Sequence, residues 1–313
     1  MSDRQLEVVL ALGGGAARGL AHIGIIRVLE DHGVRVRGIA GTSIGAIVGG
    51  LHAAGRLDHY EEYIRDLDAK GMLRLLDPVI PRSGLLGGSR VVKRLHEFLE
   101  GRVIEELDLP FCAIATDLDS GAEVVLDAGC LVQAIRASFA IPGVFTPERV
   151  DGYWLVDGGV STPVPIRAAR EMHPNLPVIA VNLNNIDMVF EESDRMALPS
   201  STDAEREIGR IERLLRRMGG DKEQRPGLLS SISDSLTHME HRISRFQIAA
   251  EDPELLLEPA VFGVGLFDFH RADPIIAAGE DCARQAIESG EIDHLIAKAQ
   301  RKRLHGDRGD RRR

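Results

Sequence analysis

The sequence predicts an α/β fold built on a mainly parallel central sheet. Short apolar runs alternate with segments of helical spacing along most of the chain, which is the pattern of strands connected by crossover helices. The first 55 residues follow the order strand, loop, helix, strand, turn, helix. This order favours parallel strands with right-handed connections.

The individual elements follow from apolar runs and from the glycines that end them. Leu6–Leu12 has the pattern of a buried strand and stops at three glycines, and the helical pattern after Gly19 ends at Gly33, a suitable C-cap. A second strand is expected at Val34–Ala40, and a helix rich in small residues follows Ser43. Further helices are expected at Leu57–Lys70, Ser89–Leu99 and Cys130–Phe139, and further strands at Leu109–Thr116, Glu123–Leu126, Gly152–Val156 and Leu176–Leu183.

The composition changes after residue 186 and divides the chain. We expect a core in residues 1–186, a helical insertion in 187–250, a return to the core in 251–303 and a basic, disordered tail in 304–313. The insertion is expected to hold a helix at Ala204–Met218 and a second helix with a heptad stripe, formed by Ile232, Leu236, Met239, Ile243 and Phe246. Such helices could form a lid, a membrane-facing surface or a homodimer contact, although the simplest prediction is that they pack on the core or on a second subunit.

Composition and charge exclude several classes of protein. The 313 residues are 44% hydrophobic and carry a formal net charge of −10, so nucleic acid is not an expected partner. Three scattered cysteines suggest no disulfide framework, and no cluster of His, Asp or Glu has metal-ligand spacing, so we expect no metal and no cofactor. The N-terminus lacks a signal-peptide pattern, and no stretch approaches the ~20 apolar residues of a membrane span. These features predict a cytoplasmic protein, with any membrane contact peripheral.

The strongest chemical signal is the segment GTSIG at residues 41–45, between a predicted strand and a predicted helix. It fits G-x-S-x-G, in which a sharp turn exposes the serine oxygen and the flanking glycines, Gly41 and Gly45, relieve crowding. The N-terminus of the following helix favours negative charge that develops near Ser43. The pattern therefore predicts a nucleophilic serine.

A second signal is the glycine-rich segment GGGAARG at residues 13–19, again between a strand and a helix. Backbone N–H groups of such a turn can bind one anion together, and Arg18 would add a positive charge or brace the loop. A dinucleotide site is the rival prediction. It is disfavoured because three residues separate Gly15 from Gly19, and because the second strand ends in RGIAGTS without the acidic residue that binds ribose.

The third signal is Asp157, which is followed by Gly158 and Gly159 and comes directly after the predicted strand YWLV. An aspartate at the carboxyl end of a strand lies where open α/β sheets build their active sites. Asp-Gly also occurs in ordinary turns, so this signal taken alone favours a turn residue.

Together these segments resemble the patatin-like phospholipase family. The resemblance rests on LGGGAARG near the start, GTSIG at the serine, DGG at the aspartate and ASFAIP at residues 137–142, which is similar to the family's helix end before the aspartate strand. Order and spacing agree over residues 6–185, and the chain looks most like the small bacterial members. The resemblance implies a patatin-like three-layer α/β/α sandwich with a helical C-terminal region.

By this resemblance, Ser43 is the nucleophile and Asp157 the base of a dyad without histidine. The resemblance also implies an oxyanion hole at the glycine loop, formed by Gly13, Gly14, Gly15 and Ala16. The residues that support these groups are Arg18, Gly19, Gly41, Gly45, Gly158 and Gly159. The implied reaction is hydrolysis of carboxylic esters of lipids, of phospholipase A or lysophospholipase type, with a lipid or another acyl ester as substrate.

Two alternatives stay open on the sequence. A Ser–His–Asp triad could use one of the 11 histidines, and His270 in DFHRAD is the one whose surroundings do not explain it. A protein of a different class, a non-catalytic lipid-binding or regulatory module, could keep the same fold and motifs without useful turnover.

Overall fold

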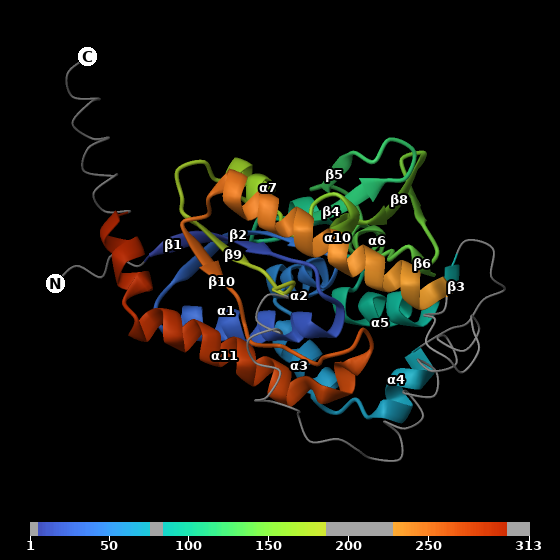
Figure 1. Ribbon diagram of the computed structural model, residues 1–313, viewed down its shortest axis with the longest axis horizontal. Coiled ribbons are helices and arrows are strands. Elements are labelled where there is room, and N and C mark those ends of the chain that lie inside the picture. The colour runs from blue at the N-terminus through green and yellow to red at the C-terminus, as the bar shows by residue number, and fades with distance from the viewer. Residues whose placement is uncertain (1–5, 76–83, 186–227, 299–313) are drawn as a thin grey trace.

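A sheet of eight strands forms the centre of the protein in the computed structural model, which describes residues 6–75, 84–185 and 228–298 (Figure 1). The strand order is β10-β9-β1-β2-β4-β8-β7, and β5 pairs with β4. Strands β10, β9, β1, β2 and β4 run parallel, whereas β5 and β8 pair antiparallel with β4, and β7 pairs antiparallel with β8. The strands are β1 (Glu7–Leu12), β2 (Arg35–Thr42), β4 (Phe111–Asp117), β5 (Glu123–Leu126), β7 (Glu148–Val150), β8 (Tyr153–Asp157), β9 (Val178–Val181) and β10 (Leu255–Leu257). The predicted mainly parallel sheet is confirmed.

Helices cover both faces of this sheet, so the molecule has three layers (Figure 1). One layer contains α1 (Ala21–Asp31), α2 (Ile44–Ala53), α3 (Leu57–Arg65), α5 (Ser89–Leu99), α6 (Leu131–Ser138) and α11 (Ala272–Glu288). The opposite layer contains α7 (Ile166–Met172) and α10 (Leu228–Glu251). The remaining described elements include α4 (Ala69–Leu75), a short two-stranded sheet of β3 (Gly84–Leu86) and β6 (Gly143–Phe145), and a helical stretch at 291–298. The predicted three-layer architecture is confirmed.

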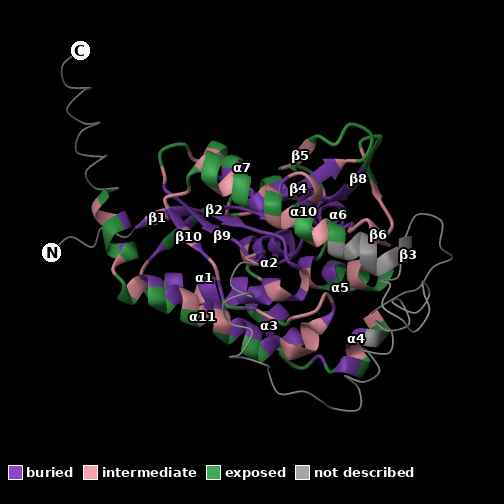
Figure 2. Cartoon of the chain, in the orientation of Figure 1, coloured by how far each residue is buried: buried purple, intermediate pink, exposed green. Residues whose placement is uncertain are grey.

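Alternation of side chains along β1 divides the core into two. Leu10 and Leu12 belong to the larger apolar cluster with α1, α2 and α11, whereas Val9 and Ala11 belong to the smaller cluster with α7. Successive strand residues point to opposite faces, and both faces of this strand are covered, so β1 is apolar and buried from Val8 to Leu12 (Figure 2). This explains why its sequence shows a continuous apolar run.

Most predicted elements occur within a few residues of their expected bounds, and the differences have local causes. The helix expected at Leu57–Lys70 is broken, because the Asp68 carboxylate accepts the N–H of Gly71 at 2.6 Å and starts α4 as a new helix. The strands β3, β6 and β7 were not predicted, since each has only three residues and lacks a periodic pattern. No helix among the described residues is long and apolar enough to cross a membrane.

Helix α10 lies across the α7 face of the sheet and packs against α7, β6 and η3 (Gly158–Val160) (Figure 1). The heptad stripe predicted on it does not form a buried seam: Met239 is 57% exposed and Phe246 69% exposed. The helix expected at Ala204–Met218 and the tail from residue 304 lie outside the described residues. The division of the chain into core, insertion and return stays a prediction.

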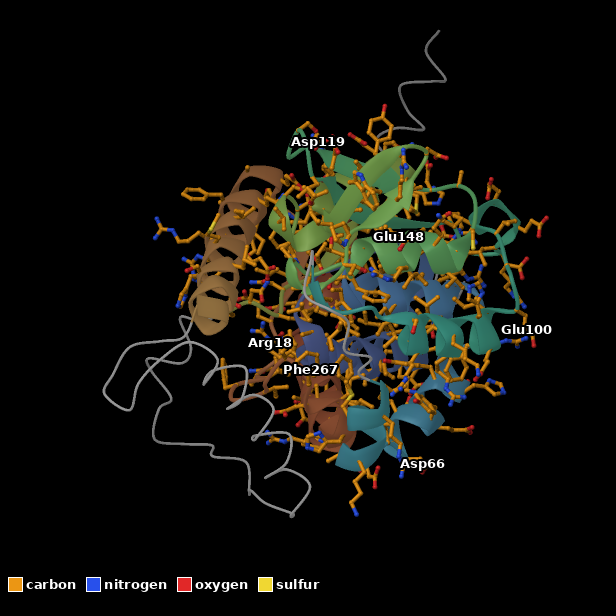
Figure 3. The ribbon with its side chains drawn as sticks, turned by 90° about the vertical axis from the view of Figure 1, so that its right-hand side faces the viewer. Arg18, Asp66, Glu100, Asp119, Glu148 and Phe267 are labelled. Carbon is orange, nitrogen blue, oxygen red and sulfur yellow. The ribbon has the colours of Figure 1, made fainter. Side chains whose placement is uncertain are left out.

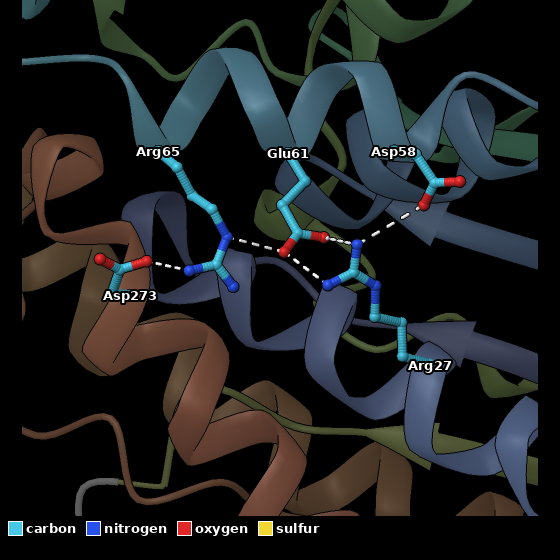
Figure 4. A network of polar contacts seen from close by, with 5 residues as sticks. All are labelled: Arg27, Asp58, Glu61, Arg65 and Asp273. Carbon is cyan, nitrogen blue, oxygen red and sulfur yellow. Dashed lines mark hydrogen bonds and ion pairs between the residues drawn. The ribbon is translucent and has the colours of Figure 1, made fainter.

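A polar network joins three helices on the opposite side of the molecule (Figure 4). The Glu61 side chain of α3 is only 4% exposed, and its carboxylate accepts hydrogen bonds from Arg27 of α1 at 2.6 Å and from Arg65 at 2.8 Å. Arg65 also pairs with Asp273 of α11. One buried carboxylate therefore connects α1 with α3, and through Arg65 with α11.

We expect Glu61→Gln to lower the free energy of unfolding by about 1–3 kcal/mol, because it removes the charge that both arginines bind within a buried site. Glu62→Gln is the matched control, since Glu62 is exposed on the same helix and such changes cost little. Urea denaturation followed by circular dichroism measures both. Equal stability of the two variants would contradict a stabilising role for the network.

Candidate active site

Ser43 occupies a strained turn between β2 and α2. Its backbone angles are φ 56° and ψ −118°, a left-handed conformation that non-glycine residues rarely adopt. The turn requires glycine on the helix side, because a Cβ on Gly45 would lie 2.1 Å from the Leu12 carbonyl oxygen. It also requires glycine on the strand side, because a Cβ on Gly41 would lie 2.4 Å from the Gly45 carbonyl oxygen. The geometry is therefore that of a nucleophile elbow.

The side chains of Ser43 and Asp157 are hydrogen-bonded to each other. Ser43 Oγ donates to Asp157 Oδ2 at 2.6 Å, and the Gly159 N–H donates to Asp157 Oδ1 at 2.7 Å. Both residues are buried, with 5% and 3% of their surface exposed. The structure thus brings together two residues that are 114 positions apart in the sequence.

Strand register explains why these two residues meet. Thr42 pairs with Ile114 of β4, and the next residue of β4, Ala115, pairs with Asp157 of β8. Because β8 is antiparallel to β4, Asp157 lies level with the turn at Ser43. The sequence argument placed Asp157 at the carboxyl edge of a parallel sheet. That reason is wrong, because Asp157 ends β8, and β8 runs antiparallel to its neighbour β4.

Two hydroxyl groups fix the backbones of these residues, and the sequence analysis assigned neither of them a role. Ser138 Oγ accepts the Ser43 N–H at 2.8 Å and donates to the Ile114 carbonyl at 2.6 Å. Thr116 Oγ1 donates to the Asp157 carbonyl at 3.0 Å. Ser138 belongs to the ASFAIP segment, so its position was noted in the sequence, but its hydrogen bonds depend on the fold.

Burial raises the pKa of the Asp157 carboxyl to about 6, against the opposing effect of the hydrogen bonds from Ser43 and Gly159. Desolvation penalises the charged form of an acid, and these two donors compensate only in part. At neutral pH the group is therefore still ionised, yet a much better proton acceptor than an ordinary aspartate.

The glycine loop lies against the serine, since a Cβ on Gly14 would be 3.5 Å from Ser43 Cβ. The Gly13 N–H donates to the Val181 carbonyl at 3.0 Å and the Gly14 N–H to the Pro163 carbonyl at 2.9 Å. In the described part of the chain, no acceptor is assigned to the N–H groups of Gly15 and Ala16. Of the four predicted oxyanion donors, two are thus engaged in holding the loop and two are free to bind.

Side chains of η1 (Ala16–Leu20) and α1 hold the loop in place. The Arg18 guanidinium donates to the carbonyls of Gly15 and Leu183 at 3.1 and 3.2 Å and to Asn184 Oδ1 at 3.1 Å. His22 is fully buried with its Nε2 2.9 Å from the Gly13 carbonyl, and burial lowers its pKa to about 4. His22 is therefore neutral and donates to Gly13, so it supports the loop and does not titrate near pH 7.

Histidine takes no part in the hydrogen bonds of the two central side chains. Ser43 Oγ and Asp157 bond to each other and to the Gly159 N–H, within the portion of the chain that the structure describes. Among the described residues, neither ring nitrogen of His270 has a hydrogen-bond partner, and both are buried. This arrangement favours a serine–aspartate pair over a triad. The described residues also include no group of three or more His, Cys, Asp or Glu that could hold a metal ion.

Comparisons with known proteins agree with this fold and these motifs. A family model described as patatin-like phospholipase matches residues 10–170. An uncharacterised NTE family protein of Mycobacterium bovis is 34% identical over 337 residues, covering 92% of this chain and 93% of the relative. Patatin-like phospholipase domain-containing protein 6 of Mus musculus is 35% identical over 186 residues, which cover 58% of this chain and 14% of that longer protein.

Among solved structures, VipD from Legionella pneumophila matches 92% of this chain and 67% of its own, with a TM-score of 0.44 and 13% sequence identity. The family model spans the glycine loop, the Ser43 turn and the Asp157 strand, and the mycobacterial relative aligns along nearly its whole length. The chain belongs to the patatin-like phospholipase family.

Proposed function

We propose that this protein is a serine acyl hydrolase that cleaves carboxylic esters of lipids, of phospholipase A or lysophospholipase type. The observation that carries the proposal is the 2.6 Å hydrogen bond from Ser43 Oγ to a buried carboxylate of Asp157, beside a loop with free N–H groups. Membership of the patatin-like phospholipase family supports lipids as the substrate class. The names of relatives that carry a patatin-like phospholipase domain agree with this.

In the acylation step, Asp157 takes the proton of the Ser43 hydroxyl while Oγ attacks the ester carbonyl. The hydrogen bond already points the proton at the base, so little reorganisation is needed. The tetrahedral intermediate then expels the alcohol, and protonated Asp157 returns the proton to it. In the second step, Asp157 takes a proton from a water molecule as its oxygen attacks the acyl carbonyl. The bond to Ser43 Oγ then breaks, the fatty acid leaves, and Asp157 returns the proton to Ser43 Oγ.

The oxyanion that forms in each step needs preorganised donors next to Ser43. The N–H groups of Gly15 and Ala16 are the best candidates, because those of Gly13 and Gly14 already bond to carbonyls. The proposal therefore narrows the predicted oxyanion hole to two residues, with Gly13 and Gly14 as the anchors of the loop. Contact with a membrane surface, homodimerisation and a cytoplasmic location stay predictions.

Ser43→Ala should lower the hydrolysis of p-nitrophenyl butyrate and of a lysophospholipid by about 10³-fold or more, because it removes the hydroxyl that forms the acyl-enzyme. A fluorophosphonate probe should label the wild-type protein once, at Ser43, as measured by intact mass and peptide mapping. Ser120→Ala is the control, since Ser120 is an exposed serine, and it should keep both activity and labelling. Equal turnover in wild type and Ser43→Ala would favour the non-catalytic lipid-binding module.

The value of kcat/KM should rise about tenfold per pH unit below the pKa of Asp157, which burial raises to about 6, and level off above it, because only the ionised base accepts the serine proton. Asp157→Asn should lower kcat by about 10²–10⁴-fold. Stopped-flow or steady-state rates between pH 4.5 and 8.5, a range of roughly two units around that pKa, provide the test. An unchanged kcat in Asp157→Asn would place the base elsewhere.

The same substitution should not destabilise the fold at neutral pH. A raised pKa means that the folded protein binds the Asp157 proton more tightly than the unfolded chain, so stability falls as pH rises from about 3.9, the ordinary aspartate value, through about 6. Asp157→Asn removes this loss. Its free energy of unfolding relative to wild type should therefore increase across that window, as measured by urea denaturation at several pH values.

Gly15→Ala tests whether the position of the glycine loop matters for catalysis, because the added methyl group displaces the loop. A Cβ on Gly15 would lie 2.8 Å from Leu183 Cβ, so the loop must shift away. We expect kcat to fall about 10–100-fold, as for a misplacement of about 1 Å. Adding Leu183→Gly removes the side-chain atoms that the new methyl group would meet and should restore part of the loss. Full activity of Gly15→Ala, or no recovery in the double variant, would contradict the assigned role of this loop.

A further inference from the structure

Helix α10 brings a second carboxylate to the site, and the mechanism above does not use it. A methyl group on Gly159 would lie 2.9 Å from Glu240 Oε1 and 3.1 Å from Asp157 Oδ1. The two carboxylates therefore approach the same point, within the ~4–6 Å over which neighbouring charges affect each other's titration. The absence of a side chain at position 159 is what leaves space for Glu240.

Among the described residues, two charged groups act on the titration of Glu240. Asp157 faces it from the end of β8, and Arg18 faces it from η1, where the guanidinium also holds the glycine loop. Figure 3 shows Arg18 between α10 and the C-terminal helices. The charged residues of α7 that meet α10, Arg167 and Arg170, act at its far end around Glu251. The strand β6 packs against α10 with the uncharged residues Gly143–Phe145.

The pKa of Glu240 is raised to about 7, first by burial and then by the negative charge of Asp157, while Arg18 acts in the opposite direction. The repulsion between two carboxylates is mutual, so Glu240 raises the proton affinity of Asp157 once it is itself ionised, above about pH 7. Below that pH Glu240 is largely neutral, and burial raises the pKa of Asp157 to about 6. Arg18 favours the ionised form of Glu240.

We propose that Glu240 is a positioning residue for the base: it acts through Asp157, which becomes a stronger proton acceptor when the ionised carboxylate of Glu240 lies beside it. This inference rests on the proposed function, in which Asp157 takes the serine proton. It adds a residue of the opposite layer, outside residues 10–170 that match the family model, to the working parts of the site. Glu240 touches neither Ser43 nor the oxyanion loop in any hydrogen bond of the described residues, so its effect is electrostatic.

The test is Glu240→Gln, which keeps the shape of the side chain and removes its charge. Above about pH 7, where Glu240 is ionised, kcat should fall about two- to tenfold because Asp157 becomes a weaker base. The acidic limb near pH 6 should move little, because Glu240 is already largely neutral there. Glu240→Asp keeps a charge and should retain part of the wild-type kcat above about pH 7. Equal kcat of Glu240→Gln and wild type at about pH 8 would overturn the proposal.

Glu251→Gln is the matched control, about three turns farther along the same helix. It removes one carboxylate from α10 but faces Arg167 of α7 and not Asp157. Its kcat above about pH 7 should equal that of wild type. An equal fall of kcat in Glu251→Gln would show a general effect of net charge or of α10 stability, and would also overturn the assignment of Glu240.

A second measurement does not require turnover. At about pH 8, where Glu240 is ionised, the stabilisation that Asp157→Asn produces reports the proton affinity of Asp157 in the folded state. That stabilisation should be smaller in the Glu240→Gln background than in the wild-type background, as measured by urea denaturation of the four proteins of this cycle. Equal stabilisation in the two backgrounds would overturn the proposal. Absence of Ser43-dependent hydrolysis would defeat the proposed function but would leave this result intact, so the two failures are distinguishable.

Discussion

The hydrogen bond between the Ser43 hydroxyl and the buried carboxylate of Asp157 is the interaction on which the rest of the site depends. A carboxylate removed from water is costly unless hydrogen-bond donors replace the solvent, and this one has two, the Ser43 hydroxyl and the Gly159 N–H. These two hydrogen bonds offset only part of the cost of burial, and the pKa of Asp157 is therefore raised. The same incompleteness makes the group a capable base, so the feature that weakens the fold is also the one that serves the proposed chemistry.

The sheet supplies the precision that this hydrogen bond requires. Ser43 and Asp157 follow or end strands on either side of β4, and the register of β4 with both strands sets them level. Gly158 allows the chain to pass close to β4, because a Cβ there would lie 2.3 Å from the Ile114 carbonyl oxygen. Ser138 bonds both to Ile114 and to the Ser43 N–H, so the helix α6 is tied to the same point. Rigid elements, not flexible loops, therefore position both reacting side chains.

The layer formed by α7 and α10 has a different role from the larger layer on the other face. The larger layer holds most of the apolar core and the Glu61 network, which concern stability. Helix α10 instead covers the turn after Asp157 and places Glu240 next to it. A helix that contributes burial and charge to a base affects its proton affinity without touching substrate. In the proposed mechanism, α10 therefore acts on the site through charge.

Local sequence determined the parts of this protein that local chemistry controls. The strand–turn–helix order around Ser43, the glycine loop and the turn after Asp157 were predictable, because a strained turn or a close backbone approach demands glycine and apolar periodicity marks buried elements. The three-layer arrangement followed from the alternation of those elements and from the resemblance that their motifs carry.

Only the tertiary structure decided the rest. The antiparallel pairing of β8 with β4 placed Asp157 at the level of Ser43. The carbonyls of Val181 and Pro163, distant in the sequence, bind the N–H groups of Gly13 and Gly14 and leave those of Gly15 and Ala16 without an acceptor among the described residues. Glu240 lies 83 positions after Asp157 in a segment without a motif, so no pattern in the chain could reveal that the two carboxylates meet. Register, hydrogen-bond partners and the pKa of a buried acid depend on which segments become neighbours, and that is a property of the packed molecule and not of any stretch of its sequence.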